Sequence, residues 1–82
     1  MYTLVYTEEF FKQIKKLNKD IQKRIMSTLE RIRIRPYPHV KKLVGNPYFR
    51  LRVGNYRVIL DIKENRLIIY VLEVGHRRSI YK

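Results

Sequence analysis

Polar and apolar residues alternate along the second half of this 82-residue chain. Two alternating runs, residues 48–53 and 56–62, are separated only by Gly54-Asn55, a pattern typical of a β-hairpin with a two-residue turn. Successive strand side chains point to opposite faces of a sheet, so one face of the hairpin is predicted to be apolar. The opposite face then carries three arginines, Arg50, Arg52 and Arg57, with Arg52 directly across from Arg57.

The first half of the chain predicts one short strand and two helices. Alternation at residues 2–6 indicates the strand, after which Thr7 is placed to cap a helix. Asp20 is the predicted cap of a second helix, which ends before Pro36 and Pro38. Apolar residues recur at helical spacing in both segments: Phe10, Ile14 and Leu17 in the first, and Ile21, Ile25, Leu29 and Ile32 in the second.

A loop and a final strand complete the predicted order of elements. Residues 36–47 are expected to form the loop, and residues 66–74 a strand that follows a turn at Glu64-Asn65. The continuously apolar run 67–72 is typical of a strand in the middle of a sheet. We therefore expect one α+β domain over residues 1–82, with the order β-α-α-β-β-β and a helical hairpin packed on one face of an antiparallel sheet.

The charge balance predicts an anionic partner. The chain has 19 Lys and Arg against 7 Asp and Glu, a net charge of +12, which exceeds what solubility requires and favours nucleic acid or an acidic protein. No apolar stretch is long enough to span a bilayer, and no signal peptide is recognised, so a cytoplasmic protein is expected. The absence of cysteine excludes disulfides, thiolate nucleophiles and cysteine-based metal sites.

The residue types present suit the cleavage of RNA without a metal. Like charges opposite each other destabilise a strand pair, so the arginine face is predicted to bind an anion. The carboxylates are scattered along the chain, and no cofactor or metal is expected. RNA supplies its own nucleophile, the 2′-hydroxyl, so a protein can cleave it by orienting the strand, stabilising the phosphorane with guanidiniums and moving two protons. No function is assigned to His39.

Four short segments follow one another in an order that is typical of a known family: Lys42-Leu43-Val44-Gly45, Tyr48-Phe49-Arg50-Leu51-Arg52, Gly54-Asn55-Tyr56-Arg57, and Val74-Gly75-His76-Arg77-Arg78 with Tyr81 shortly after it. With the order of elements, they resemble the RelE toxins of toxin–antitoxin systems, of the archaeal type, over essentially the whole chain. The resemblance implies a metal-independent endoribonuclease that enters the ribosomal A site and cuts mRNA, inhibiting translation. It also implies an acidic, RelB-like antitoxin.

The resemblance also implies roles for individual residues. Arg57 is expected to hold the scissile phosphate, on an open surface patch. Arg77 is the candidate for stabilising the transition state or protonating the leaving oxygen, and Tyr81 is the candidate general base. The basic strand supplies Arg50 as a further catalytic candidate. The expected RNA contacts are Arg52, His76, Arg78, Lys41 and Lys42.

The chain departs from the family pattern in two places. Bacterial members with strong activity carry lysines on the basic strand, where this chain has Tyr48 and Arg50. A lysine can release its proton when its surroundings favour the neutral form, whereas arginine stays charged, so the identity of the general base is left open. The segment between Arg77 and Tyr81 is also shorter than in those relatives. A slower nuclease is the expectation.

Two other functions remain open at this point. A ParE-like protein shares the fold but poisons DNA gyrase by binding, without a catalytic set of arginine and tyrosine; Arg57 and the Gly75-His76-Arg77-Arg78 segment weigh against it. A plain RNA-binding domain would stack bases on exposed aromatic side chains. Tyr56 is predicted on the apolar face, and Tyr48 and Tyr70 form no evident stacking platform with it, so the RNA-binding domain ranks last.

Overall fold

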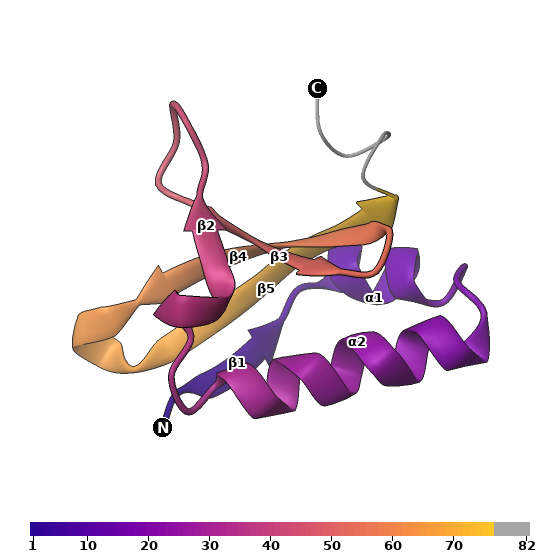
Figure 1. Cartoon of the computed structure of the whole chain (residues 1–82), viewed down its shortest axis with the longest axis horizontal. Helices are drawn as coiled ribbons and strands as arrows, with labels where there is room; N and C mark the ends of the chain where they lie inside the picture. Colours follow the sequence, from indigo (N-terminus) through magenta and orange to yellow (C-terminus); the bar gives the residue numbers. More distant parts are fainter. Residues whose placement is uncertain (77–82) are drawn as a thin grey trace.

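The computed structural model describes residues 1–76, which form a five-stranded sheet with two α-helices on one face (Figure 1). The elements are, in chain order, β1 (Thr3–Tyr6), α1 (Glu8–Ile14), α2 (Lys19–Ile32), the 3-10 turn η1 (Tyr37–His39), β2 (Val40–Lys42), β3 (Phe49–Val53), β4 (Tyr56–Lys63), the 3-10 turn η2 (Glu64–Arg66) and β5 (Ile68–His76). The strand order in the sheet is β1-β5-β4-β3-β2. The α+β class is confirmed, and no helix within residues 1–76 has the length and apolar character needed to cross a membrane.

The sheet is mixed, so the prediction of a wholly antiparallel sheet was wrong. β1 runs parallel to β5, with Thr3 beside Ile68 and Tyr6 beside Val71. The helical hairpin carries the chain from one edge of the sheet, at β1, to the other edge, at β2. β5 then returns next to β1 and becomes an interior strand, as its apolar run predicted.

The segment predicted as a loop between residues 36 and 47 contains η1 and the edge strand β2, which is a second correction. β2 pairs antiparallel with β3, so Val40 lies beside Leu51 and Lys41 beside Arg50. A strand of three residues is too short to show an alternating pattern. Its pairing adds a lysine to the row of arginines.

The apolar core lies between the helices and the sheet. Its buried members are Tyr2, Phe10, Ile14, Ile25, Leu29, Ile32, Leu51, Val53, Val58, Leu60, Ile62, Ile69, Val71 and Val74. Thr7 caps α1 as predicted, accepting a hydrogen bond from the Phe10 amide at 3.1 Å. The cap of α2 is Asn18 rather than Asp20, because the Asn18 side chain accepts from the Ile21 amide at 3.0 Å.

A β-bulge in β5 is held by the side chains of Thr7, which caps α1, and of Gln13 within α1. The register shifts between Ile59 and Leu60 of β4, which lie opposite Glu73 and Val71, so Leu72 is the extra residue. The Thr7 hydroxyl donates to the Leu72 carbonyl at 2.8 Å. Beyond the bulge, the amide of Val74 donates to Oε1 of Gln13 at 2.7 Å. The bulge reverses the alternation, which turns Val74 into the core and leaves Gly75 on the open face.

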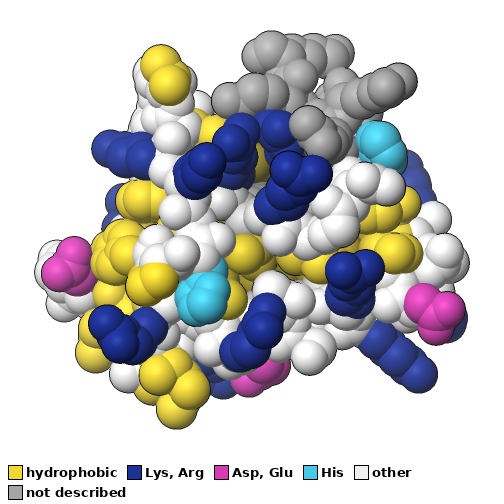
Figure 2. Space-filling model, in the orientation of Figure 1, with side chains coloured by type: hydrophobic (Ala, Val, Ile, Leu, Met, Phe, Trp, Pro, Cys, Tyr) yellow, Lys and Arg dark blue, Asp and Glu magenta, His cyan; other side chains and the backbone are white. Residues whose placement is uncertain are grey.

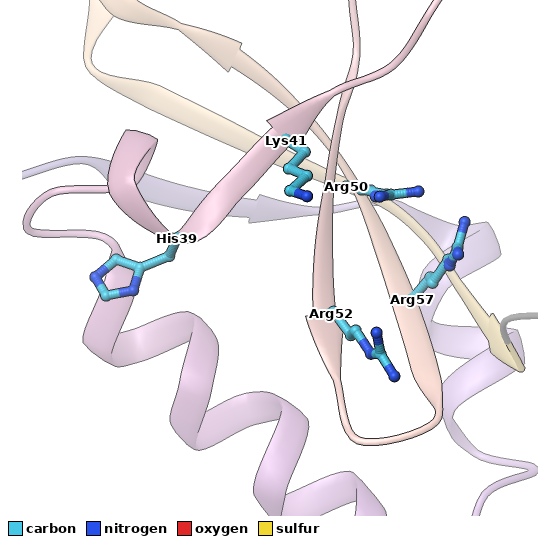
Figure 3. Close-up of a pocket in the computed structure, with 5 residues that line it drawn as sticks. All are labelled: His39, Lys41, Arg50, Arg52 and Arg57. Atoms are coloured by element: carbon cyan, nitrogen blue, oxygen red, sulfur yellow. The ribbon is translucent and has the colours of Figure 1, made fainter.

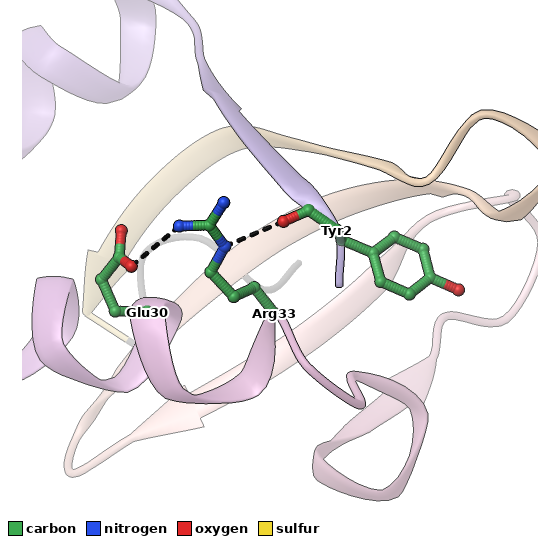
Figure 4. A network of polar contacts seen from close by, with 3 residues as sticks. All are labelled: Tyr2, Glu30 and Arg33. Atoms are coloured by element: carbon green, nitrogen blue, oxygen red, sulfur yellow. Dashed lines mark hydrogen bonds and ion pairs between the residues drawn. The ribbon is translucent and has the colours of Figure 1, made fainter.

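Arg33 ties the end of α2 to the start of β1 (Figure 4). Its Nε donates to the Tyr2 carbonyl at 2.8 Å, and the Tyr2 amide donates to the Arg33 carbonyl at 2.8 Å. Nη1 of Arg33 also contacts Glu30 at 3.0 Å. Glu30 is 60 % exposed, so this ion pair contributes little, and the paired bonds to Tyr2 fix the edge strand.

Candidate functional site

The side of the sheet that the helices leave open carries a pocket of about 150 Å³ (Figure 3). It is lined by Lys41 of β2, Arg50 and Arg52 of β3, Arg57 of β4, and His39 of η1. We call these five residues the cationic pocket. Three neighbouring strands therefore converge their basic side chains on one place.

The β3–β4 hairpin builds most of the cationic pocket. Gly54 has a φ of +59°, which suits the first position of a type II′ turn and favours glycine. This turn fixes the predicted register, with Arg52 opposite Arg57 and Arg50 opposite Ile59. Cβ atoms directly opposite lie about 5 Å apart, so the Arg52 and Arg57 side chains leave the sheet next to each other.

The pocket is positive and one of its arginines is buried. Arg57 is 8 % exposed, contrary to the expectation of an open surface patch. Opposite it on β5 lies Gly75, which has no side chain. No carboxylate is among the described side chains that line the pocket, and Figure 2 shows the acidic side chains of this view at the margins, away from the clustered Lys and Arg. An anion entering the pocket would therefore meet several cations and no competing carboxylate from its lining.

His39 lines the cationic pocket, although no function was assigned to it from the sequence. In Figure 3 its ring points away from the three arginines, so it lies at the margin of the pocket. His39 could not be assigned to the site because the strand β2 was not predicted. With Val40–Lys42 as a strand beside β3, His39 comes two residues before Lys41 and lies on the same side of the sheet.

The remaining predicted site residues divide into two groups. Lys42 lies beside Phe49 on β3, one position on from Lys41, and is not among the pocket residues. His76 is paired with Tyr56, and their rings meet edge to face at 5.6 Å, on the side of the sheet that faces the helices. Neither is brought to the arginines. Arg77, Arg78 and Tyr81 lie outside the described residues.

Tyr37 is a tyrosine near the pocket strands that is unsuited to act as a base. Desolvation, and after it the negative charge of Glu64, raises the pKa of Tyr37 to about 12. Its hydroxyl lies 3.2 Å from a carboxylate oxygen of Glu64, and its ring packs edge to face on Phe49. The Tyr37 hydroxyl therefore stays protonated well above neutral pH and connects η1 to η2.

This raised pKa predicts a loss of stability in alkaline solution. Between pH 10 and 12 the unfolded chain releases the Tyr37 proton before the folded protein does, so the free energy of unfolding falls with pH in that window. Below pH 10 Tyr37 makes its full contribution to the free energy of unfolding. Urea unfolding of wild type and Tyr37→Phe at several pH values measures it, and we expect a shallower fall for the variant. Identical slopes would contradict the assignment.

The arrangement suits the binding of a phosphate group in a nucleic-acid backbone. Guanidiniums donate pairs of parallel hydrogen bonds to phosphate oxygens and remain charged at any physiological pH. Arg50 and Arg57 lie diagonally across the β3–β4 ladder, so two guanidiniums can reach one phosphate. Within residues 1–76 the pocket therefore offers charge stabilisation, while the predicted base, Tyr81, lies beyond them.

Comparison with known proteins agrees with this fold and identifies the family. The family model described as the ParE toxin of type II toxin–antitoxin systems, parDE, matches residues 4–81. Toxin RelE3 of Methanocaldococcus jannaschii is 31 % identical, over 95 % of this chain and 93 % of that protein. The mRNA interferase RelE of Shigella flexneri is 25 % identical, over 93 % of this chain and 83 % of its own length.

Solved structures show the same architecture. The RelBE2 toxin–antitoxin complex of Mycobacterium tuberculosis contains a chain that matches with a TM-score of 0.85 at 24 % identity, covering 93 % of this chain and 98 % of that one. The archaeal RelE–RelB complex of Pyrococcus horikoshii contains a chain that matches with a TM-score of 0.82 at 25 % identity, covering 95 % of this chain and 97 % of that one. The chain thus belongs to the ParE toxin family of type II toxin–antitoxin systems. Within the RelE/ParE superfamily it belongs with the RelE toxins of archaeal type.

Proposed function

We propose that this protein is an endoribonuclease that cuts mRNA on the ribosome and thereby stops translation. The observation that carries the proposal is the cationic pocket, whose lining includes Arg50, Arg52 and Arg57 from two strands on the open face of the sheet. The similarity to an mRNA interferase of the RelE type supports it.

The reaction requires no cofactor in this proposal. The 2′-oxygen of the ribose attacks the adjacent phosphorus, the bond from phosphorus to the 5′-oxygen breaks, and the products are a 2′,3′-cyclic phosphate and a 5′-hydroxyl. Arg57 holds the scissile phosphate, and Arg50 with Arg52 neutralises the charge that develops on the phosphorane. One proton leaves the 2′-hydroxyl and one reaches the 5′-oxygen, for which Tyr81 and Arg77 are the proposed groups.

The cognate partner is proposed to be an acidic, RelB-like antitoxin, as the toxins of Mycobacterium tuberculosis and Pyrococcus horikoshii were solved in complex with antitoxins. A net charge of +12 favours such a partner as well as the ribosome. A cytoplasmic location is proposed as well, because the ribosome would be the site of action.

RNA binding by the isolated protein should depend steeply on salt. The cationic pocket contributes four permanently basic side chains, so we expect a slope of about −2 to −3 for the logarithm of affinity against the logarithm of salt concentration. Arg52→Ala should make the slope shallower by about 0.7, because one phosphate contact is lost. Fluorescence anisotropy with a labelled, uncleavable RNA measures both. A flat response in the wild type would contradict phosphate binding in the pocket.

Expression in growing cells distinguishes mRNA cleavage from gyrase poisoning. Gyrase poisoning is the alternative to test because the matching family is described as ParE toxins. An mRNA-cutting protein should stop incorporation of labelled amino acids within minutes, while DNA replication continues at first. A gyrase poison would instead induce the DNA damage response while protein synthesis continues. Co-expression with an acidic RelB-like antitoxin is the control that should restore growth.

A further inference from the structure

Tyr48 is an exposed aromatic residue next to the cationic pocket. It directly precedes β3, and 36 % of its surface is exposed. The amide of Leu43 donates to the Tyr48 carbonyl at 2.9 Å, which extends the β2–β3 ladder by one residue pair beyond Lys42 and Phe49. Alternation along β3 therefore places Tyr48 on the same face of the sheet as Arg50.

The backbone at Tyr48 is fixed on both sides. In addition to the bond from Leu43, its own amide donates to Oδ1 of Asn46 at 2.9 Å. Pro47 between them restricts the chain further, and Gly45, with a φ of +83°, closes the β2–β3 loop. A tyrosine ring has only two side-chain torsions, so little conformational entropy is lost when it binds a flat partner.

The distance from Tyr48 to the pocket suits one nucleotide. Residues two apart on a strand are separated by about 6.8 Å, so the Cα atom of Tyr48 lies about that far from the Cα atom of Arg50. A pocket lined by Lys41 and three arginines suits a phosphate better than the uncharged base attached to it. Tyr48, an exposed ring two residues from Arg50 on the same face, can then receive the base, because aromatic rings stack on nucleobases of any sequence.

We propose that Tyr48 forms a nucleobase subsite, on which a base adjoining the phosphate in the cationic pocket stacks. This rests on the proposed function, because it takes single-stranded RNA as the ligand of the pocket. The subsite accepts any base, since every base presents a flat face, and it orients the RNA strand relative to Arg50 and Arg57.

Binding of short RNA to the full chain tests this without cleavage. The probes are a 2′-O-methyl hexanucleotide, which lacks the attacking hydroxyl, and an abasic oligomer with the same phosphates. Tyr48→Ala should weaken binding of the base-bearing probe about tenfold and leave the abasic probe unchanged, whereas Tyr48→Phe binds both as the wild type does. The matched control is Phe11→Ala, which removes an exposed aromatic side chain of α1, far along the chain from β3. It should change the binding of neither probe.

A fluorescence reporter gives a second readout, because the chain contains no tryptophan. In Tyr48→Trp the base-bearing probe should quench the emission and the abasic probe should not, while Phe11→Trp responds to neither. Equal losses with both probes in Tyr48→Ala, or no quenching of Tyr48→Trp, would overturn the subsite. Arg57→Ala should weaken both probes alike, so failure of the subsite is distinguishable from failure of the pocket as the RNA site.

Discussion

Arg57→Ala is expected to lower mRNA cleavage by at least about 100-fold, because it removes the guanidinium that is proposed to hold the scissile phosphate in position for attack by the 2′-oxygen. Arg57 is the most buried basic residue of the cationic pocket, at 8 % exposed, and a buried charge interacts with a bound phosphate more strongly than a solvated one. A ribosome programmed with a defined message, followed by primer extension, measures the single-turnover rate.

Two further variants make the Arg57 result specific. Arg57→Lys keeps the charge but loses the paired hydrogen bonds, so an intermediate rate is expected. Arg66→Ala removes an exposed arginine in η2, at the far end of β4, and should cleave as the wild type does. Thermal unfolding of each variant is the control for retention of the fold. Wild-type cleavage by folded Arg57→Ala would exclude Arg57 from the reaction.

Phe10→Ala is expected to reduce the free energy of unfolding by about 3–5 kcal/mol, because a fully buried ring is removed from the core. Phe10 has no exposed surface and stacks on Tyr6, with ring centroids 5.4 Å apart. A domain of this size has a total stability of about 5–15 kcal/mol, so the loss would leave a large unfolded fraction.

The neighbouring residue provides the control for Phe10. Phe11 is 47 % exposed and lies 5.6 Å from the same Tyr6 ring, centroid to centroid. Phe11→Ala should therefore cost less than about 1 kcal/mol, a value typical of surface substitutions that lose part of an aromatic pair. Urea unfolding followed by circular dichroism measures both variants. Equal losses would show that the core does not form around Phe10.

Sequence predicted those parts of the fold that depend on neighbours in the chain. The hairpin around Gly54-Asn55 was predicted with its register, because a two-residue turn fixes which residues face each other. The clustering of Arg50, Arg52 and Arg57 on one face followed from that register alone. The roles assigned to these arginines in the reaction remain predictions.

The features that were not predicted from the sequence depend on contacts between segments far apart in the chain. The pairing of β1 with β5 joins residues more than 60 positions apart, and nothing in either strand encodes its direction. The bulge at Leu72 depends on the Thr7 hydroxyl, 65 residues away, and is hidden in a continuously apolar run. Because that bulge reverses the alternation, His76 lies against Tyr56 and not beside Arg57.

Cleavage of mRNA on the ribosome is tested by mapping new 5′ ends on translated messages after brief induction of the protein in growing cells, and by comparing them with those in cells that express Arg57→Ala. A nuclease that cuts mRNA on the ribosome should leave 5′-hydroxyl ends that keep the codon phase of the reading frame, occur only where ribosomes translate, and disappear in the variant. Growth arrest without such cuts, or cuts that persist in folded Arg57→Ala, would contradict this prediction.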